Sequence, residues 1–566
     1  MTNHHLSSRL SGYPDPTRIL RIACQTLLLL GLCVATTHAA PLPTQPKLVL
    51  QITVDQLRGD LLPRFKNRFG PGGFRLLMDH GAWFANAHYQ TANTVTCAGH
   101  AVLVTGADVG EHGIVGNDWY DRDAGHNMYC VDDPHFPVIG EPARAGTGMS
   151  PVNLTSTTVG DELVSASGGR SRVFAIAGKD RSSIVPGGHL GKAFWFSGTG
   201  GMASSHYYYD SLPPWVQDWN DRKAILRYRD KGWSLARPPE TYLNRASAQN
   251  PFAHPKANTG AMFPHPLNNG GDAGLVAAIR FTPFLDELTA EFAQELIMQE
   301  NLGGTGAADY LSISFSSTDY VGHSFGPNSV EAEDNLIHLD ATLAGLFAFI
   351  DKSVGLRNTV IVLSADHGVD DIPEEHRAAG YMTERFGGDT LKAKLNAALR
   401  KRLGIAEDLV AAVIPPNVYL DPAKVRTLKL EVVAAENALA EELRAEPGIA
   451  YAFTRSDLQA GRIGHTPLLD SVQRAFHPKR SGDVVAIPKQ LYYFDAEPDY
   501  YAATHGTPYG YDTFVPVIVL VPGMKALTSQ EPVAPGQIAP TLSALLGIRS
   551  PSGCSCDPPL PHVLQP

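Results

Sequence analysis

Uninterrupted apolar runs that give way to polar residues recur along the chain. Three of them are Lys47–Val54 (KLVLQITV), Tyr310–Phe315 (YLSISF) and Thr359–Leu363 (TVIVL). A short apolar run without polar alternation predicts a strand that is buried on both faces, as in a parallel sheet covered by helices. Two further candidate strands of this kind are Arg172–Ala177 (RVFAIA) and Val515–Val521 (VPVIVLV).

A helical pattern separates two of these runs. From Ser329 to Val354, apolar residues recur every three or four positions, which predicts an amphipathic helix. They are Leu336, Leu339, Leu343, Leu346, Phe347 and Ile350. A strand, a helix and a strand in this order predict a parallel crossover. We therefore expect an α/β fold with a doubly wound, mostly parallel sheet flanked by helices.

Two stretches, at about 182–304 and 378–498, show weaker periodicity and contain more Gly, Pro, Asn and aromatic residues. We interpret them as insertions that decorate the core. The helix expected at Leu430–Arg444 belongs to the second insertion. Because large α/β enzymes often exceed the usual domain size, we expect residues 41–566 to form one catalytic domain.

The N-terminus has the order of a secretory signal peptide: basic residues, the apolar stretch Leu27–Ala35, then small residues. The apolar stretch is shorter than the roughly 20 residues of a membrane-spanning helix. We expect residues 1–40 to be removed near Ala39 or Ala40, giving a periplasmic or secreted protein without a transmembrane span. The alternatives are a retained anchor or a lipoprotein signal that uses Cys33.

Net charge and cysteine content narrow the possible partners and compartment. The formal net charge of −11 argues against a nucleic-acid partner or an anionic membrane surface. Four of the six cysteines follow the expected signal peptide. Four cysteines in an exported protein allow three disulfide pairings, and the spacing does not choose among them. They are Cys97, Cys130, Cys554 and Cys556.

Carboxylates follow three of the expected strands, at Asp55, Asp319 and Asp366. One such carboxylate is usually a cap for the next helix, but three together indicate a shared site, because parallel strands end at one crevice. Imidazoles accompany them at His323, His367 and His505. Carboxylate and imidazole ligands without thiolates suit zinc, with manganese or iron as weaker candidates, and six ligands suffice for two metal ions.

Thr96 lies where the polar loop of NTVTCAGHAVLVTG gives way to the helical pattern of Ala98–Val104. A threonine at such a place is ordinarily a helix N-cap. A bound dication changes that interpretation, because it lowers the pKa of a coordinated hydroxyl. The start of a helix also directs backbone N–H groups at an anion. We therefore expect Thr96 to be a nucleophile.

Short blocks around these residues occur in a characteristic order along the chain. They are VDQLRGD, NTVTCAGH, HGIVGNDWY, GKDRSSIV, STDYVGHSFGP, SADHG and HGTPYGYDTFVPV. Through these blocks the sequence resembles the alkaline phosphatase superfamily, in particular its PafA-type phosphate-irrepressible alkaline phosphatases. The likeness extends from about Leu48 to Val521, with the motifs in the family's order.

This resemblance implies two zinc ions and a role for each motif residue. The ligands of the zinc that holds the nucleophile would be Asp55, Thr96, Asp366 and His367. The ligands of the second zinc would be Asp319, His323 and His505. Thr96 would attack phosphorus in line to give a phosphothreonine intermediate, and the second zinc would stabilise the leaving oxygen.

The resemblance also implies three residues that bind the phosphoryl group. Asn117 would donate a hydrogen bond to a nonbridging oxygen, and Lys179 and Arg181 would form the pair that distinguishes monoesterases from diesterases. A monoester dianion has an extra negative oxygen for a cationic pair to stabilise, whereas a diester has a second substituent there. Without the resemblance, Lys179 and Arg181 would be interpreted as part of a solvated turn.

Other residues near these motifs are expected to be structural. We interpret His100 as a packed helix histidine and His112 as part of a turn, and Cys97 as a source of backbone N–H and of a disulfide. The expected function is hydrolysis of small-molecule phosphate monoesters. The physiological substrate, phosphate regulation, attachment to the envelope, the oligomeric state and a third metal ion stay open, and a monomer is compatible with the sequence.

Several other functions compete with this expectation. The nearest is a nucleotide pyrophosphatase/phosphodiesterase, against which Lys179 and Arg181 argue. An arylsulfatase would need C/S-x-P-x-R where this chain has CAGHA at 97–101, and a phosphoethanolamine transferase would need several membrane spans. A non-catalytic, metal-containing protein that binds phosphorylated ligands is the alternative from another class.

Overall fold

The computed structural model describes residues 45–564 apart from 143, 145 and 556. The signal peptide expected at 1–40 lies outside the described residues. A ten-stranded sheet forms the core, with the strand order β18-β2-β17-β10-β1-β9-β6-β7-β8-β5. In this order the strands are β18 (Leu527–Ser529), β2 (Ala82–His88), β17 (Phe514–Leu520), β10 (Thr359–Ser364), β1 (Leu48–Val54), β9 (Asp309–Phe315), β6 (Val173–Ala177), β7 (Lys192–Phe196), β8 (Met202–Ser205) and β5 (Val138–Ile139).

The centre of the sheet is parallel. Strand β1 pairs in parallel with β10 on one side and with β9 on the other, and β9 continues in parallel to β6. Thr53 of β1 is in register with Ser364 of β10 and with Ser314 of β9. The three strands therefore end at the same level, so the residues that follow them share one edge of the sheet.

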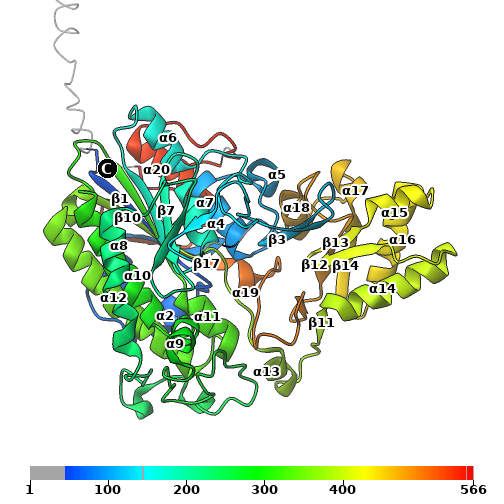
Figure 1. The fold of residues 1–566 in the computed structure, drawn as a ribbon, viewed down its shortest axis with the longest axis horizontal. Coiled ribbons are helices and arrows are strands. Elements are labelled where there is room, and N and C mark those ends of the chain that lie inside the picture. The colour runs from blue at the N-terminus through cyan, green and yellow to red at the C-terminus, as the bar shows by residue number, and fades with distance from the viewer. Residues whose placement is uncertain (1–44, 143, 145, 556, 565–566) are drawn as a thin grey trace, which may run out of the picture. The chain divides into compact units, whose positions relative to one another are not determined.

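Helices cover both faces of this sheet (Figure 1). Alternate residues of β1, such as Leu50 and Ile52, pack in one apolar cluster with α10 (Phe284–Gln299) and α12 (Val330–Ser353), and Val49 packs in a second cluster. That second cluster contains residues of α4 (Thr96–Thr105), α6 (Val159–Ala166), α7 (Arg181–Gly187) and α20 (Ile538–Leu546). The predicted α/β class and the parallel crossover through the helix at 329–354 are confirmed.

The two stretches interpreted as insertions differ in structure. Within 378–498, a four-stranded antiparallel sheet packs against α14 (Gly388–Leu403) and α16 (Val432–Arg444) around its own apolar cluster. Its strands, in order, are β12 (Val410–Ile414), β13 (Asn417–Leu420), β15 (Val484–Pro488) and β14 (Ile449–Thr454). The stretch at 182–304 is not wholly a decoration, because β7 and β8 extend the central sheet and α10 covers it.

The other elements connect or flank these layers. The remaining α-helices of the described chain are α2 (Leu61–Phe65), α3 (Phe74–His80), α5 (Val109–His112), α8 (Pro214–Asp221), α9 (Gly271–Ile279), α11 (Ser317–Phe325), α13 (Pro373–Ala378), α15 (Pro422–Thr427), α17 (Arg455–Gln459), α18 (Pro467–Arg474) and α19 (Gly510–Thr513). The remaining strands are β3 (Asp118–Asp121), β4 (His126–Tyr129), β11 (Arg385–Gly387) and β16 (Tyr493–Asp495). Among the described residues, no helix combines the length and the apolar character that crossing a bilayer requires.

Candidate active site

Thr96 is the first residue of α4, and the preceding Val95 has the extended backbone of an N-cap. Thr96 is therefore not the N-cap itself, so its hydroxyl is not committed to closing the helix. The side chain is buried, with its Oγ 3.4 Å from His367 Nε2 and 3.5 Å from Arg181 Nη2. This hydroxyl lies where the N–H groups of α4 begin.

Helix α4 packs closely against the loop that follows β10. A Cβ on Gly99 would lie 2.0 Å from the carbonyl oxygen of Asp366, so only glycine permits this approach. His100 is fully buried one residue further on, with Nδ1 at 2.9 Å from Thr96 O and 3.2 Å from Asp366 Oδ2, and Nε2 at 3.0 Å from Ser314 Oγ. His100 thus links the helix to the sheet edge, in agreement with a structural role.

The predicted ligands converge at the carboxyl ends of β1, β9 and β10. Helix α11 follows β9 and presents Asp319 and His323 on one face, where His323 Nε2 lies 3.1 Å from Asp319 Oδ1. His505 Nε2 approaches the same oxygen at 3.7 Å. His367 Nε2 lies 3.5 Å from Asp55 Oδ1 and 3.6 Å from Asp366 Oδ2.

The three imidazoles are oriented alike. Nδ1 of His323, His367 and His505 lies 2.7–2.9 Å from the backbone carbonyl oxygens of Ala503, Gly368 and Thr94 respectively. Because a carbonyl oxygen only accepts, Nδ1 has the proton and the Nε2 lone pair faces the carboxylates. Histidines that bind metal ions are generally held in this way by a partner of the other ring nitrogen.

Burial and mutual repulsion shape the charges of the carboxylates. Burial raises the pKa of Asp55 well above its ordinary value, and the nearby Asp319 and Asp366 carboxylates raise it further. Burial also tends to raise the pKa of Asp319, but the neighbouring His323 and Lys179 outweigh burial and bring that pKa well below its ordinary value. Asp55 Oδ1 finds no hydrogen-bond donor in the part of the chain that the structure describes.

These residues form two overlapping groups of candidate metal ligands. Ligand atoms of Asp319, His323 and His505 lie within 4.8 Å of one another, as do those of Asp55, Asp319 and His367. The structure thus places Asp319 close to both groups, whereas the motif alone assigned it to one. A buried carboxylate oxygen without a donor, together with Nε2 lone pairs and no thiolate among the grouped ligands, fits zinc.

Two cations reach the same space from the turn between β6 and α7. Lys179 is buried, and its Nζ lies 2.6 Å from Asp55 Oδ2 and 2.6 Å from Asp319 Oδ2. Burial disfavours its charge, but Asp319 and Asp55 raise the pKa of Lys179 above its ordinary value, so it stays an ammonium. Arg181 donates to the Tyr129 hydroxyl at 3.2 Å and approaches Thr96 as described. The pair faces the site and is not a solvated turn.

Asn117 lies beside the start of α4. Its Oδ1 accepts the backbone N–H of Cys97 at 2.9 Å, so the amide N–H groups are the part of the side chain that can donate to a ligand. Cys97 is joined by a disulfide to Cys130, which follows β4, and this settles one of the pairings that the sequence left open. Cys556, by contrast, lies outside the described residues.

Three residues at the site were not predicted from the sequence. Tyr129 holds Arg181, Tyr501 stacks on His323 with ring centroids 4.3 Å apart, and Gln56 contacts two of the carboxylates. Gln56 belongs to the VDQ block, directly after Asp55, so the motif contained a signal for it. Tyr129 and Tyr501 lie in segments without a comparable pattern.

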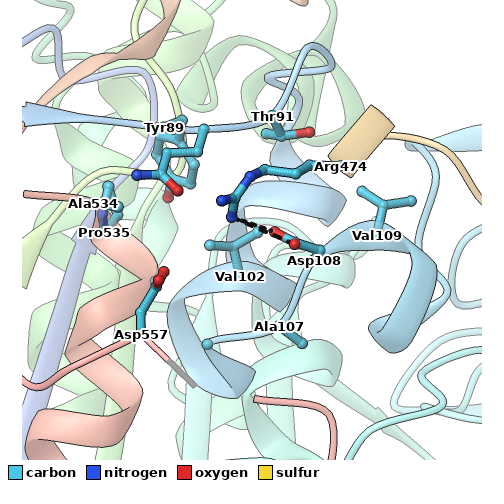
Figure 2. A pocket seen from close by; sticks show the side chains of 13 residues that line it. Tyr89, Thr91, Val102, Ala107, Asp108, Val109, Arg474, Ala534, Pro535 and Asp557 are labelled. Carbon is cyan, nitrogen blue, oxygen red and sulfur yellow. Dashed lines mark hydrogen bonds and ion pairs between the residues drawn. The ribbon is translucent and has the colours of Figure 1, made fainter. Parts of the chain in front are cut away.

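A separate cavity of about 20 Å³ lies at the far end of α4 (Figure 2). It is lined by Val102, Ala107 and Asp108 together with Arg474, whose Nη1 lies 3.4 Å from Asp108 Oδ1. Its volume is about that of one water molecule. None of the predicted site residues lines it, so it is separate from the candidate site.

Comparisons with known proteins agree with this geometry. A family model described as type I phosphodiesterase / nucleotide pyrophosphatase matches residues 49–512, and the chain belongs to that family. Alkaline phosphatase PafA of Elizabethkingia meningoseptica is 35% identical over 528 residues, which cover 91% of this chain and 94% of that protein. Alkaline phosphatase PhoV of Synechococcus elongatus is 33% identical over 515 residues, covering 90% and 91%.

The solved structures give the same result. The crystal structure of wild-type alkaline phosphatase PafA matches with a TM-score of 0.86 and 34% identity, over 92% of this chain and 99% of that one. Within its family, the chain therefore groups with the PafA-type alkaline phosphatases. The resemblance inferred from the motifs is confirmed.

Proposed function

We propose that the protein is an exported alkaline phosphatase that binds two zinc ions and hydrolyses phosphate monoesters through a phosphothreonine on Thr96. The observation that supports this most strongly is the approach of Lys179 and Arg181 to the carboxylate cluster and to the Thr96 hydroxyl. A cationic pair at this place suits a substrate with an unesterified, dianionic phosphoryl group. The similarity to alkaline phosphatases PafA and PhoV supports the same activity.

The metal ions would be held by two sets of residues that meet at Asp319. One set is Asp55, Thr96, Asp366 and His367, and the other is Asp319, His323 and His505. Bound zinc supplies Lewis acidity, which lowers the pKa of a hydroxyl and stabilises negative charge on phosphoryl oxygens.

The charges of the proposed complex balance. Three aspartates, a threonine alkoxide and a monoester dianion together have six negative charges. Two dications, Lys179 and Arg181 together have six positive charges. A diester monoanion would leave one positive charge without a partner in this buried site, which disfavours it.

The reaction proceeds in two displacements. Thr96 Oγ releases its proton to solvent and attacks phosphorus, and the ester P–O bond breaks on the opposite side. The leaving oxygen takes up a proton from solvent and departs as the alcohol. A water molecule then attacks the phosphothreonine, the bond between phosphorus and Oγ breaks, and Oγ regains a proton as phosphate departs. In both steps the nonbridging oxygens are bound by the side chains of Asn117, Lys179 and Arg181, with Asn117 donating through its amide.

A phosphodiesterase is the second candidate function, because the matching family model is named for phosphodiesterases and nucleotide pyrophosphatases. The test is kcat/KM for p-nitrophenyl phosphate and for bis-p-nitrophenyl phosphate, on the wild type and on Lys179→Ala/Arg181→Ala. A monoesterase prefers the monoester by a wide margin and loses that preference in the double variant. A diester preference, or an unaffected variant, supports the phosphodiesterase.

A third outcome would identify a non-catalytic protein. If neither ester is turned over but p-nitrophenyl phosphate binds the zinc-loaded protein, the site is a receptor for phosphorylated ligands. Metal analysis of the purified protein accompanies this test, and we expect two zinc ions per chain. A fully active protein without metal would contradict the two-zinc proposal.

Export is proposed from the expected signal peptide and from the disulfide. Disulfides persist mainly in oxidising compartments, and Cys97–Cys130 adjoins the proposed nucleophile. After expression in a Gram-negative host, the periplasmic or secreted protein should have its N-terminus near residue 40. A cytoplasmic protein that retains residues 1–40 would contradict export.

A further inference from the structure

Gln56 has an unusual backbone for a residue with a side chain. It directly follows Asp55 at the end of β1, is 1% exposed, and has a φ of 68°. This left-handed region is uncommon for residues other than glycine and costs free energy unless the surrounding structure enforces it. Such an outlier in the middle of a candidate site points to a functional role.

This conformation lets Gln56 contact the two carboxylates that follow the neighbouring strands. The backbone N–H of Gln56 donates to Asp366 Oδ1 at 3.1 Å, and its side-chain Nε2 donates to Asp319 Oδ1 at 2.8 Å. Strand β1 lies between β9 and β10, so a residue at its end is placed to reach the loops after both. If Gln56 continued the extended backbone of β1, its backbone N–H and its side-chain NH₂ would not both point at these carboxylates.

The side-chain amide has only one possible orientation. A carboxylate accepts and does not donate when ionised, so the end of Gln56 that faces Asp319 is the NH₂ group. The amide oxygen points at α11, where a Cβ on Gly322 would lie 1.9 Å from Oε1. Gly322 therefore leaves room for Gln56, and both ends of its amide face α11, which also contains Asp319.

The contacted oxygen of Asp319 is the one that faces the imidazoles. Asp319 Oδ1 lies 3.1 Å from His323 Nε2 and 3.7 Å from His505 Nε2, whereas Oδ2 lies 2.6 Å from Lys179 Nζ. The Gln56 amide occupies one lone pair of Oδ1 and so fixes the rotation of the carboxylate against the attraction of Lys179. The other lone pair stays directed toward the histidines.

We propose that Gln56 is a positioning residue that fixes the carboxylates of Asp319 and Asp366 relative to each other, and so sets the geometry between the two zinc sites. This inference rests on the proposed two-zinc function. Mutation of a residue that hydrogen-bonds to a metal ligand commonly lowers metal affinity or activity by about 10- to 100-fold, and we expect a loss of that size here. The effect should fall mainly on the site that contains Asp319, because the backbone N–H to Asp366 survives any substitution except proline.

Two variants separate the amide from the backbone strain. Gln56→Met keeps the length and the unfavourable φ but has no donor, and Gln56→Gly removes the donor and also the strain. Lys429→Gly is the matched control, because Lys429 has a φ of 53° and lies outside the site. Zinc affinity is measured by competition with a chromophoric chelator on folded, zinc-loaded protein, and folding is checked by circular dichroism.

Both Gln56 variants should bind one of the two zinc ions about 10- to 100-fold more weakly than the wild type, and their kcat for p-nitrophenyl phosphate should fall. Lys429→Gly should match the wild type in both. Gln56→Gly cannot fail through added strain, so it keeps the test decisive if Gln56→Met does not fold.

The outcomes separate the inference from the function on which it rests. If the wild type binds two zinc ions and both Gln56 variants hold them with unchanged affinity, the positioning role is wrong and the proposed function stands. If the wild type binds fewer than two zinc ions, the proposed function is wrong, and this inference is wrong with it.

Discussion

At the scale of single residues, the hydroxyl of Thr96 is the group on which the proposed chemistry depends. Thr96→Ala should lower kcat/KM for p-nitrophenyl phosphate by at least about 10³-fold, because removing a nucleophile leaves only binding and electrostatic effects. Thr96→Ser keeps the hydroxyl and should retain most of the activity. Mass spectrometry of acid-quenched reactions should detect a phosphorylated peptide that contains residue 96 in the wild type.

A remote threonine provides the control for this prediction. Thr427 is exposed on α15 and donates to the Ala423 carbonyl, so Thr427→Ala removes a hydroxyl without approaching the site. It should leave kcat/KM unchanged. Equal activity of Thr96→Ala and the wild type would exclude a phosphothreonine intermediate.

His112 gives a prediction about pH. Burial lowers the pKa of His112 to about 3, with His477 and Arg480 adding repulsion. Below the ordinary pKa of about 6.5, the unfolded chain binds a proton that the folded chain refuses, so stability is lost as pH falls from 6.5 toward 3. Between pH 7 and pH 5 this loss amounts to about 2 kcal/mol.

The measurement is urea denaturation at pH 7 and pH 5, compared between the wild type and His112→Asn. His112 Nδ1 accepts the N–H of Ile114, and an Asn amide oxygen can occupy that position without titrating. The variant should lose less stability on acidification than the wild type, by about the amount assigned to His112. Identical pH dependence in the two proteins would show that folding does not lower the pKa of His112.

The sequence could predict a site residue only where the role of that residue follows from its type. Asp55, His323 and His367 were predicted because carboxylates and imidazoles that follow buried strands are typical of metal ligands at a sheet edge. Gln56 was not, although it lies in the VDQ block, because its role depends on a positive φ that its residue type does not reveal. Tyr129 acts only through its contact with Arg181 and gave no signal of its own.

At the scale of elements, the close packing of α4 on the loop after β10 positions Thr96, the proposed nucleophile. Gly99→Ala adds a Cβ that would meet the Asp366 carbonyl oxygen at 2.0 Å, so the helix must move away from the sheet. A displacement of Thr96 by about 1 Å is expected to lower kcat/KM about 10²-fold. The thermal midpoint should also fall, because the contact involves backbone that cannot rotate aside.

A second helical glycine serves as the control. Gly345 lies within α12, and a Cβ there would meet nothing within 4 Å. Gly345→Ala should therefore stabilise the protein by up to about 1 kcal/mol and leave kcat/KM unchanged. If Gly99→Ala behaves in the same way, the contact between α4 and Asp366 does not position the site.

The same elements show where sequence patterns succeed. Strands β1, β9 and β10 were predicted because both of their faces are buried, which makes the apolar run continuous. Strands β7 and β8 were missed, since their runs are short and lie next to glycines. The four-stranded sheet within 378–498 depends on pairing between strands far apart in the chain, such as β13 with β15, which local periodicity does not encode.

At the scale of the whole molecule, the candidate site joins segments from residue 55 to residue 505, so metal binding should stabilise the entire fold. Without a cation, the buried carboxylates of Asp55, Asp319 and Asp366 repel one another, with Lys179 as their nearest balancing charge. A ligand that binds only the folded state stabilises it by about 2.7 kcal/mol at 100 times its dissociation constant. Removal of zinc by a chelator should therefore lower the thermal midpoint, and added zinc should restore it.

Calcium is the informative control in this experiment, because it prefers six to eight oxygen ligands and has little affinity for imidazole. It should not restore the thermal midpoint of the chelated protein, whereas zinc should do so with a dependence that saturates at two ions per chain. In Asp319→Asn, whose carboxylate adjoins both ligand groups, the restoration by zinc should be reduced. A thermal midpoint that is indifferent to chelator and zinc would mean that the carboxylate cluster is balanced by the protein alone.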